Sequence, residues 1–247
     1  MTGDNGLIDN IREIWPHFAI ADADAWDTDP LVSATIPSAQ RPRSIMPSAK
    51  SVVVIWVPVS PTIIHTAPSI YYREHYKTLN TLLDVTSQRI ATMLDAAGYD
   101  AAYVPRDGYH GIEGLRKDPS SFFSHRHAAY LAGLGTFGIN NVLLTETHGP
   151  RVRFASVITS ADLPAGKLSN NKLCTECMRC VRECPAGALS GDTYPEGLDK
   201  ALCVERSGAL AKRGISPCGR CIAVCPVGKA VEPPSEDFTK AVRRYEI

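Results

Sequence analysis

The first 173 residues of this 247-residue chain contain no cysteine, although the whole chain has eight. No apolar run approaches the roughly 20 residues that a membrane-spanning helix needs, so we expect no membrane association. Neither sign of charge is in excess, because 26 Lys and Arg residues balance 26 Asp and Glu residues. A broad nucleic-acid surface needs excess basic charge, so a nucleic-acid partner is not expected, although the balance leaves room for a local basic patch.

The start of the chain, MTGDNGLIDNIREIW, lacks the basic stretch and apolar core of a signal peptide. We therefore expect a cytoplasmic location, where disulfides are rare and eight cysteines need another purpose. The length predicts one or two domains of roughly 100–200 residues each. The cysteine boundary favours two domains, a cofactor and substrate domain over 1–165 and a cysteine-rich domain over 166–247.

The cysteines that are present form two related motifs. The first, LCTECMRCVRECP, has the C-x2-C-x2-C-x3-C-P spacing of bacterial ferredoxins, in which the fourth cysteine ligates a second cluster. The second, PCGRCIAVCPVGK, repeats the C-x2-C and C-x3-C-P elements, and the isolated Cys203 supplies the remaining ligand. The predicted ligands are Cys174, Cys177, Cys180 and Cys225 for cluster 1, and Cys184, Cys203, Cys218 and Cys221 for cluster 2.

Structural zinc is the main alternative for these motifs, since C-x2-C pairs are common zinc ligands. Zinc sites favour two separated pairs, whereas this chain has overlapping spacings that end in C-P twice. We therefore predict a bacterial ferredoxin-like module with two 4Fe–4S clusters, which move single electrons. The cysteine-free region then has to provide the destination of those electrons.

The cysteine-free region predicts an α/β fold. Residues 1–50 are irregular apart from a short helix at 7–14. Residues 49–59, AKSVVVIWVPV, form a continuous β-branched run that is typical of a buried central strand. Residues 71–98 have apolar side chains at helical spacing and end in a glycine. Residues 101–104 are the next expected strand, which completes a strand–helix–strand unit.

A glycine-rich turn, GLGTFGINN, follows an expected helix at 125–135 and leads into an expected strand pair at 142–145 and 151–159. The dinucleotide-binding fingerprint should instead follow a strand and open a helix, so we reject a nicotinamide site. Glycines could let backbone N–H groups approach a planar or anionic ligand. A packing turn without any ligand is the simpler alternative. Residues from 231 onward are expected to begin a loose C-terminal extension.

The segment AGLGTFGINNVLLTETHGPRVRFASVITSADLP, joined to CTECMRCVRECP, resembles epoxyqueuosine reductases and reductive dehalogenases. The similarity extends upstream through YYREHYKTLN and RPRSIMPSAKSVVVIWVPV and so covers most of the chain. The resemblance implies a nitroreductase-like α/β domain that binds cobalamin, followed by the two-cluster module. The chain is a short form without the C-terminal helical repeats or the twin-arginine leader of some family members, so we do not expect their substrates to carry over.

The resemblance also implies which residues lie near the corrin. The glycine turn and two neighbouring segments supply them: Tyr72, Arg73, His127, Gly133, Leu134, Gly135, Thr136, Gly138, Asn140 and Asn141. Arg151 joins this set from the sequence itself, because Arg151 and Arg153 alternate along an expected strand and could contact carboxamide or phosphate groups of a cofactor. A solvated strand face is the alternative for that pair.

Three residues are candidates for proton transfer. Asp118 is an approximate match to the proton-donating Asp of epoxyqueuosine reductases, and burial beside a reduced cofactor would raise its pKa. Tyr109 lies in a Gly-flanked loop that is typical of a pocket rim. His125 could donate a proton or ligate cobalt, as could His127; at i and i+2 of a helix the two do not share a face, so a two-histidine metal site is not expected.

Three functions are compatible with these features. The first is an oxidoreductase that passes electrons through two 4Fe–4S clusters to cobalamin, which reduces a small organic substrate. The second is an electron-transfer protein or reductive activator of a corrinoid or other redox partner. The third is a reductase with flavin in the same pocket. All three need a low-potential donor of the ferredoxin or flavodoxin type, and a homodimer is compatible with each.

Overall fold

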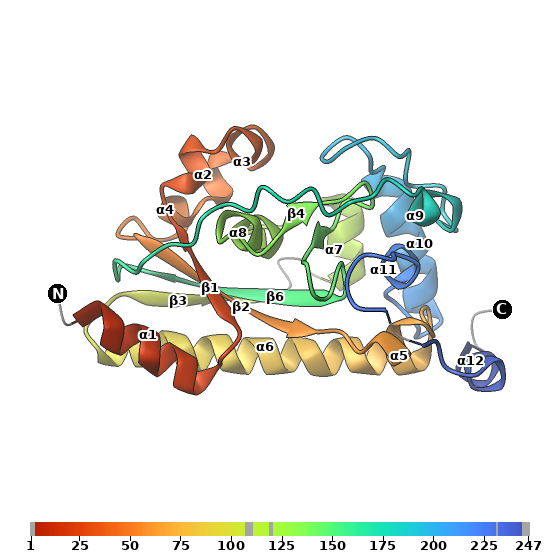
Figure 1. The fold of residues 1–247 in the computed structure, drawn as a ribbon, viewed down its shortest axis with the longest axis horizontal. Coiled ribbons are helices and arrows are strands. Elements are labelled where there is room, and N and C mark those ends of the chain that lie inside the picture. The colour runs from red at the N-terminus through yellow and green to blue at the C-terminus, as the bar shows by residue number, and fades with distance from the viewer. Residues whose placement is uncertain (1–2, 107–110, 119–120, 231, 244–247) are drawn as a thin grey trace.

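The computed structural model describes residues 3–106, 111–118, 121–230 and 232–243 (Figure 1). Its centre is a four-stranded sheet in the order β1-β2-β6-β3, in which every neighbouring pair is antiparallel. The strands are β1 (Phe18–Asp22), β2 (Ser51–Pro58), β3 (Ala101–Val104) and β6 (Val152–Thr159). The predicted strand at 49–59 is therefore central, as its continuous apolar run requires.

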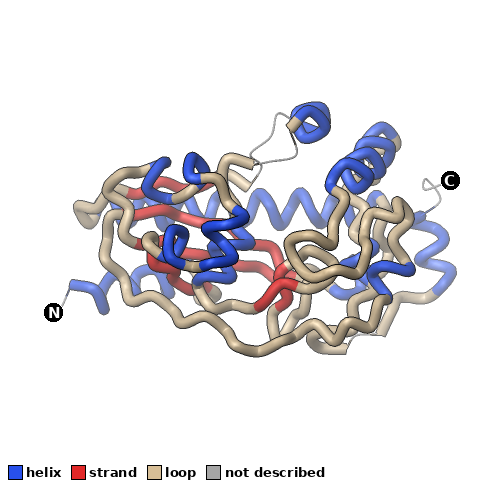
Figure 2. Tube along the Cα trace, turned by 90° about the horizontal axis from the view of Figure 1, so that it is seen from above, coloured by secondary structure: helices blue, strands red, loops and turns tan. Residues whose placement is uncertain are grey.

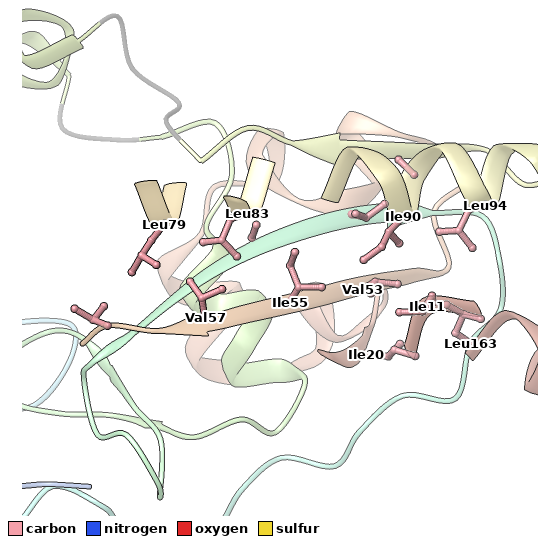
Figure 3. Close-up of a cluster of buried hydrophobic side chains, with 14 of the residues drawn as sticks. Ile11, Ile20, Val53, Ile55, Val57, Leu79, Leu83, Ile90, Leu94 and Leu163 are labelled. Carbon is pink, nitrogen blue, oxygen red and sulfur yellow. The ribbon is translucent and has the colours of Figure 1, made fainter. Parts of the chain in front are cut away.

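Two helices, α1 (Gly3–Ile14) and α6 (Ile70–Ala96), cover one face of the sheet (Figure 1). The long helix begins where the Ser69 hydroxyl accepts a hydrogen bond from the Tyr72 backbone N–H, and it ends before Gly98, whose φ is +91°. Its Leu83 and Ile90 pack on Val53 and Ile55 of β2 in a closed apolar core (Figure 3). This apolar core fixes α6 on the sheet.

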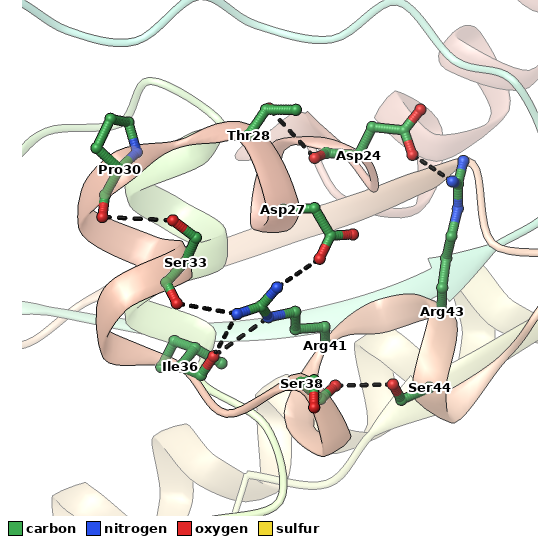
Figure 4. A network of polar contacts seen from close by, with 10 residues as sticks. All are labelled: Asp24, Asp27, Thr28, Pro30, Ser33, Ile36, Ser38, Arg41, Arg43 and Ser44. Carbon is green, nitrogen blue, oxygen red and sulfur yellow. Dashed lines mark hydrogen bonds and ion pairs between the residues drawn. The ribbon is translucent and has the colours of Figure 1, made fainter.

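The opposite face carries shorter elements around the buried Trp26. They are α2 (Ala25–Thr28), α3 (Pro30–Thr35), the 3-10 helix η1 (Ser38–Gln40), α4 (Pro42–Ile45) and α8 (His125–Leu131). Arg41 ties them together by donating to the Asp27 carboxylate and to the Ser33 and Ile36 carbonyls (Figure 4). The expected irregularity of residues 1–50 was therefore wrong, since side-chain hydrogen bonds replace long periodic elements there.

The cysteine-rich segment lies at one end of the sheet, beside α5 (Pro61–Ile64) and the start of α6 (Figures 1 and 2). Residues 160–178 run along the molecule to reach it. Its helices are α9 (Arg179–Arg182), α10 (Lys200–Lys212), α11 (Arg220–Ala223) and α12 (Glu236–Arg243), and α10 packs against α7 (Gly111–Lys117). No helix in the described residues is long and apolar enough to cross a membrane.

Two local expectations are corrected by this arrangement. β5 (Leu143–Leu144) pairs with β4 (Thr136–Phe137) in a separate two-stranded sheet, whereas β6 inserts between β2 and β3. The expected pairing of 142–145 with 151–159 was therefore wrong, because β6 finds a longer partner in β2. The C-terminal extension is also not loose: Arg243 of α12 donates to the carbonyls of residues 65, 66 and 67.

Candidate functional site

The first set of cysteines encloses one small cavity. Three cysteines come from the first motif and the fourth comes from the second, and Asn140 of the glycine turn lies beside them. Burial raises the pKa of Cys225, Arg151 lowers it, and the neighbouring thiols of Cys180 and Cys177 raise it further. The residues that the structure brings together here are Cys174, Cys177, Cys180 and Cys225.

The second predicted set combines Cys184 of the first motif, Cys218 and Cys221 of the second motif, and the isolated Cys203. Burial raises the pKa of Cys221 to about 12, and the thiols that raise it further belong to Cys203, Cys218, Cys180 and Cys184, in decreasing order. Four crowded thiols resist ionisation unless a cation neutralises them, which is the chemistry that bound iron supplies. The Cys184 sulfur also accepts a hydrogen bond from the Ala188 N–H at 3.3 Å, a contact of the kind that tunes cluster potentials.

Each motif contains one residue with a left-handed backbone conformation directly after a cysteine. In the parallel segments CMRC and CGRC, Met178 has φ +59° and Gly219 has φ +69°, and a short helix starts directly afterwards. Gly219 has a second reason to be glycine, since an added Cβ would lie 2.6 Å from the Tyr72 ring. The two cysteine loops are thus built alike, and the second is packed against α6.

Arg151 holds the second cysteine loop in place. Its buried guanidinium donates to the carbonyls of Cys225 at 2.9 Å, Val227 at 2.8 Å and Lys229 at 3.2 Å. These donors are spent on the protein backbone, so the expected contact to a cofactor is not what the structure shows. Arg153 has different partners from Arg151. Its Nε donates to the Asn80 side chain, and its guanidinium stacks on Tyr76.

Beside the second set of cysteines lies a cleft with two lobes that share Ser121, Ser124 and Arg126. The lobe against the sheet, which we name the sheet lobe, has a volume of about 300 Å³. The lobe against the cysteine module, which we name the module lobe, has a volume of about 350 Å³. The sheet lobe is lined by Tyr72, Tyr76, His125, Arg153, Phe154 and Ile222 among others, and the module lobe by His127, Asn141, Tyr194 and Cys203 among others.

Tyr72 connects the second cysteine loop to the sheet lobe. Its ring packs on Gly219, and its hydroxyl is under the electrostatic influence of Cys221 and Cys218. Burial raises the pKa of Tyr72 above its usual range, while Arg153 acts in the opposite direction. The phenol therefore keeps its proton at neutral pH and presents a donor to the cleft.

The two histidines of α8 face different lobes. His125 lines the sheet lobe, and its Nδ1 lies 2.9 Å from the Ser156 hydroxyl. Burial lowers the pKa of His125 to about 4; a hydrogen bond to the Pro105 carbonyl opposes this, and Arg153 adds a smaller lowering effect. The ring is thus a neutral, oriented donor or acceptor at neutral pH.

His127 is buried between the α/β domain and the cysteine module. Its Nδ1 lies 2.7 Å from the Ser124 hydroxyl and its Nε2 lies 2.7 Å from the Tyr194 hydroxyl. Burial, with the charges of Arg126 and Lys200, lowers the pKa of His127 to about 3. Since both ring nitrogens are engaged, this residue is a neutral link between the two parts and has no nitrogen to spare for a metal.

The glycine turn packs against the chain itself. An added Cβ would lie 2.0 Å from the Lys167 carbonyl oxygen at Gly133 and 1.8 Å from the Leu144 carbonyl oxygen at Gly135. At Gly138 it would meet the side chains of Asn140 and Leu144. Backbone packing therefore accounts for these glycines, and none of them lines the cleft.

The other residues of the turn divide between the module and the cleft. Leu134 packs in the Trp26 core, and the Thr136 hydroxyl donates to the Asn171 carbonyl at 3.0 Å. Asn140 lies at the cluster 1 cysteines, and Asn141 lines the module lobe and donates to the Pro195 carbonyl at 3.2 Å. The turn thus connects the α/β domain with the cysteine module, and Asn141 is its one residue that lines the cleft.

Two other predicted site residues, Asp118 and Arg73, do not line the cleft. Asp118 is exposed just after α7, and Arg73 pairs with Glu74 on the outer surface of α6, because only every third or fourth residue of that helix faces inward. Tyr109 lies outside the described residues. The Asp118 and Arg73 expectations are therefore not supported by the geometry.

Two cleft residues, Tyr194 and Arg126, make contacts that the sequence did not predict. Tyr194 stacks on Phe137 with a centroid distance of 3.9 Å and reaches His127 from 67 residues away along the chain. Arg126 donates to the Asn141 carbonyl and lines both lobes. A single aromatic residue in a loop and an arginine between two histidines have no spacing signal that would single them out.

The chain thus joins an α/β domain to a segment that carries all eight cysteines. Residues 173–229 match the 4Fe-4S dicluster domain family, which confirms the predicted two-cluster module. The tetrachloroethene reductive dehalogenase of Dehalobacter restrictus (strain DSM 9455 / PER-K23) is 30% identical over 216 residues, or 80% of this chain and 36% of the relative. The epoxyqueuosine reductase of Synechococcus sp. (strain RCC307) is 32% identical over 104 residues, or 38% of this chain and 31% of the relative.

Solved structures of the same two groups share the fold. An epoxyqueuosine reductase bound to a tRNA-Tyr stem loop superposes with a TM-score of 0.60 at 19% identity, covering 90% of this chain and 64% of that chain. A reductive dehalogenase whose structure suggests a mechanism for B12-dependent dehalogenation gives a TM-score of 0.57 at 17% identity, covering 92% of this chain and 31% of that chain. The homologues of this protein are thus reductive dehalogenases and epoxyqueuosine reductases, as its motifs predicted, and the chain spans about a third of the length of the dehalogenases.

Proposed function

We propose that this protein is an iron–sulfur reductase that passes electrons from cluster 1 to cluster 2 and then to a cobalamin in the two-lobed cleft, where a small organic substrate is reduced. The observation that carries the proposal is the position of the cleft. Cys203 lines the module lobe, and Tyr72 contacts the Cys218–Cys221 loop while lining the sheet lobe. Both lobes therefore adjoin ligands of the same cluster.

The lining of the cleft fits a large ligand with a flat face and polar edges. Aromatic and aliphatic side chains supply the apolar walls, among them Phe154 and Ile222. Polar groups at the junction of the lobes, Ser124 and Arg126, offer donors to amide or phosphate oxygens. These residues, with Asn141, would hold the corrin, and the cofactor would supply a strongly reducing metal centre.

The protein's own part in the chemistry is proton supply and exclusion of water. Tyr72 holds a proton in the sheet lobe, and Arg153 is the nearby cation that would balance a phenolate after that proton leaves. His125 lies in the same lobe as a neutral, hydrogen-bonded ring that can orient a polar substrate group. We assign the proton-donating role to Tyr72 in place of Asp118.

The first experiment is anaerobic purification with cobalamin supplied during expression, followed by iron and cobalt analysis and a visible spectrum. Two cubes and one corrin require about eight irons and one cobalt per chain. Iron without cobalt, at any cobalamin concentration, would reject the corrin. A flavin absorption band instead of cobalt would move the proposal to the flavin reductase.

An electron-transfer role without a substrate is the second candidate. It is favoured by the exposure of one ligand in each cysteine set, Cys177 and Cys203, since exposed ligands give a partner protein a short route to either cluster. A loaded protein that reduces an added corrinoid protein but consumes no small-molecule substrate would establish this role. Cytoplasmic location and dimerisation stay predictions.

A further inference from the structure

A hollow of about 600 Å³ lies between α9 and α11. Five cationic side chains and one carboxylate line it: Arg151, Arg179, Arg182, Arg220, Lys229 and Glu183. The chain as a whole has net charge +0, so this is a local concentration of positive charge. We name it the basic hollow.

The cations of the basic hollow fall into two kinds. Arg151 is buried and its donors are used by backbone carbonyls, while Arg220 lies 2.7 Å from the Glu183 carboxylate. Arg179, Arg182 and Lys229 are exposed. Arg151 and Arg220 form the floor of the hollow. Arg179, Arg182 and Lys229 form its rim, where their positive charges are solvated.

The hollow touches the ligand set of cluster 1. Cys225 lines it, together with the small apolar residues Ala223, Val224 and Pro226. A partner bound over these residues would lie next to a predicted ligand of cluster 1. The positive field is also visible at His65 on the same wall, whose pKa is lowered first by burial and then by the charges of Arg151 and Arg220.

We propose that the basic hollow is the docking site for a small acidic one-electron carrier protein, which reduces cluster 1 through the Cys225 side. A patch of carboxylates on such a carrier matches an exposed basic rim around a small apolar floor, the usual anatomy of a transient interface. A site for a small free anion would instead need preorganised, unspent donors, and three of the five N–H groups of the buried guanidinium here are already used by backbone carbonyls. This inference rests on the two-cluster part of the proposed function and is independent of the substrate.

The proposed reaction at the hollow is a one-electron transfer. One electron leaves the reduced carrier and enters cluster 1, and no covalent bond forms or breaks. The protein's contribution is to hold the carrier's redox group near Cys225 and to raise the rate of encounter by charge attraction.

The test uses the cluster-loaded protein, a reduced flavodoxin as probe, and anaerobic stopped-flow measurement of cluster bleaching. The variant Arg179→Glu/Arg182→Glu reverses two rim charges. The variant Lys50→Glu/Arg89→Glu makes the same change in net charge at two exposed positions that line no cavity described above. Iron content confirms that both variants carry both clusters.

At low ionic strength we expect the second-order rate constant to fall at least tenfold in the rim variant and to change little in the control variant. The wild-type rate should fall steeply with added salt, and the rim variant should show a shallower dependence. A calorimetric titration with oxidised flavodoxin should show the same loss of affinity without any electron transfer.

Three results would overturn the docking site: equal rates in the two variants, a wild-type rate that does not depend on salt, or displacement of flavodoxin by millimolar inorganic phosphate at constant ionic strength, which would assign the hollow to a small anion. The proposed function fails separately. Its failure would show as normal flavodoxin-driven cluster reduction with no cobalt and no substrate turnover.

Discussion

Tyr72 connects the cysteine module with the cleft. Its ring packs against Gly219 of the second cysteine loop, and the same residue lines the sheet lobe. Replacing it by Phe keeps that packing and removes the proton. General acids contribute roughly 10²–10⁴-fold to rates, so we expect Tyr72→Phe to lower turnover of any substrate that the loaded protein reduces by about 100-fold. Iron content and flavodoxin-driven cluster reduction should not change.

The matched control for this change is Tyr103→Phe, which removes an exposed phenol from β3. Its turnover should equal that of the wild type. Full turnover in Tyr72→Phe, with cobalt and iron bound, would remove the phenol from the proton pathway and leave His125 as the titratable group of the sheet lobe.

His127 makes stability depend on pH. Its pKa is about 3 in the folded protein against 6.5 for the free side chain, so the unfolded chain binds the extra proton first as the pH falls. Stability is full above about pH 6.5 and declines below it. Between pH 7 and pH 5 the loss from this one ring is about 2 kcal/mol.

The measurement is chemical denaturation of the cluster-loaded protein at pH 7 and pH 5, in the wild type and in His127→Gln. The amide of Gln does not titrate, so the variant should lose about 2 kcal/mol less than the wild type over this range. His125 titrates in both proteins and cancels from the difference. An identical pH dependence in the two proteins would mean that His127 is not buried as a neutral ring.

At the scale of single elements, the cysteine loops depend on backbone geometry that few residues allow. Gly219 has φ +69° and its missing Cβ makes room for the Tyr72 ring. Gly214 has almost the same φ, +71°, but no atom lies within 4 Å of its would-be Cβ. The pair therefore separates backbone strain from a steric clash.

We expect Gly214→Ala to cost about 1–2 kcal/mol from the left-handed backbone alone. Gly219→Ala should cost more and should displace the loop that carries Cys218 and Cys221, so its iron content should fall toward four per chain. Denaturation midpoints and iron analysis of the two variants check this. Equal stability and equal iron would show that the Tyr72 contact does not position the loop.

Elements with a strong periodic signal were the ones that could be predicted from the sequence. The buried run of β2 and the apolar spacing of α6 gave both elements to within two residues. β1 was not predicted, because it is an edge strand of only five residues. A pattern of that length is too short to be recognised in the surrounding sequence. For the glycine turn the structure favours the packing alternative, since the backbone of Lys167 and Leu144 occupies the space beside Gly133 and Gly135.

The cysteine sets could be predicted from local sequence spacing, whereas the contacts around the cleft could not. Ligand grouping was predicted from local spacing, and the structure brings Cys174, Cys177, Cys180 and Cys225 around one small cavity. The assignment of the eight cysteines to two clusters stays a prediction. The contact of His127 with Tyr194 joins residues from two separate parts of the chain, and no local pattern encodes it. Long-range pairs of this kind follow only from the packing of the module on the sheet.

For the whole molecule, the arrangement predicts a direction of electron flow. Cys225 of the cluster 1 set faces the basic hollow, whereas Cys203 of the cluster 2 set lines the cleft. The hollow is thus lined by a predicted ligand of cluster 1, and the cleft by a predicted ligand of cluster 2. A donor bound at the hollow would reduce cluster 1 first, and the cleft would draw electrons from cluster 2.

Two single-ligand variants test this order, Cys225→Ala in cluster 1 and Cys203→Ala in cluster 2. In Cys203→Ala we expect flavodoxin to reduce the remaining cluster at the wild-type rate while turnover in the cleft falls by at least 100-fold. In Cys225→Ala the flavodoxin-driven rate itself should fall, although cluster 2 is retained and is reduced by excess dithionite. About four irons should remain in each variant, and thermal melts establish that both are folded. The opposite pattern, with fast flavodoxin reduction in Cys225→Ala and slow reduction in Cys203→Ala, would reverse the order of the clusters and would place the electron entry at the exposed Cys203 side, because only an entry there makes cluster 1 dispensable for the first electron.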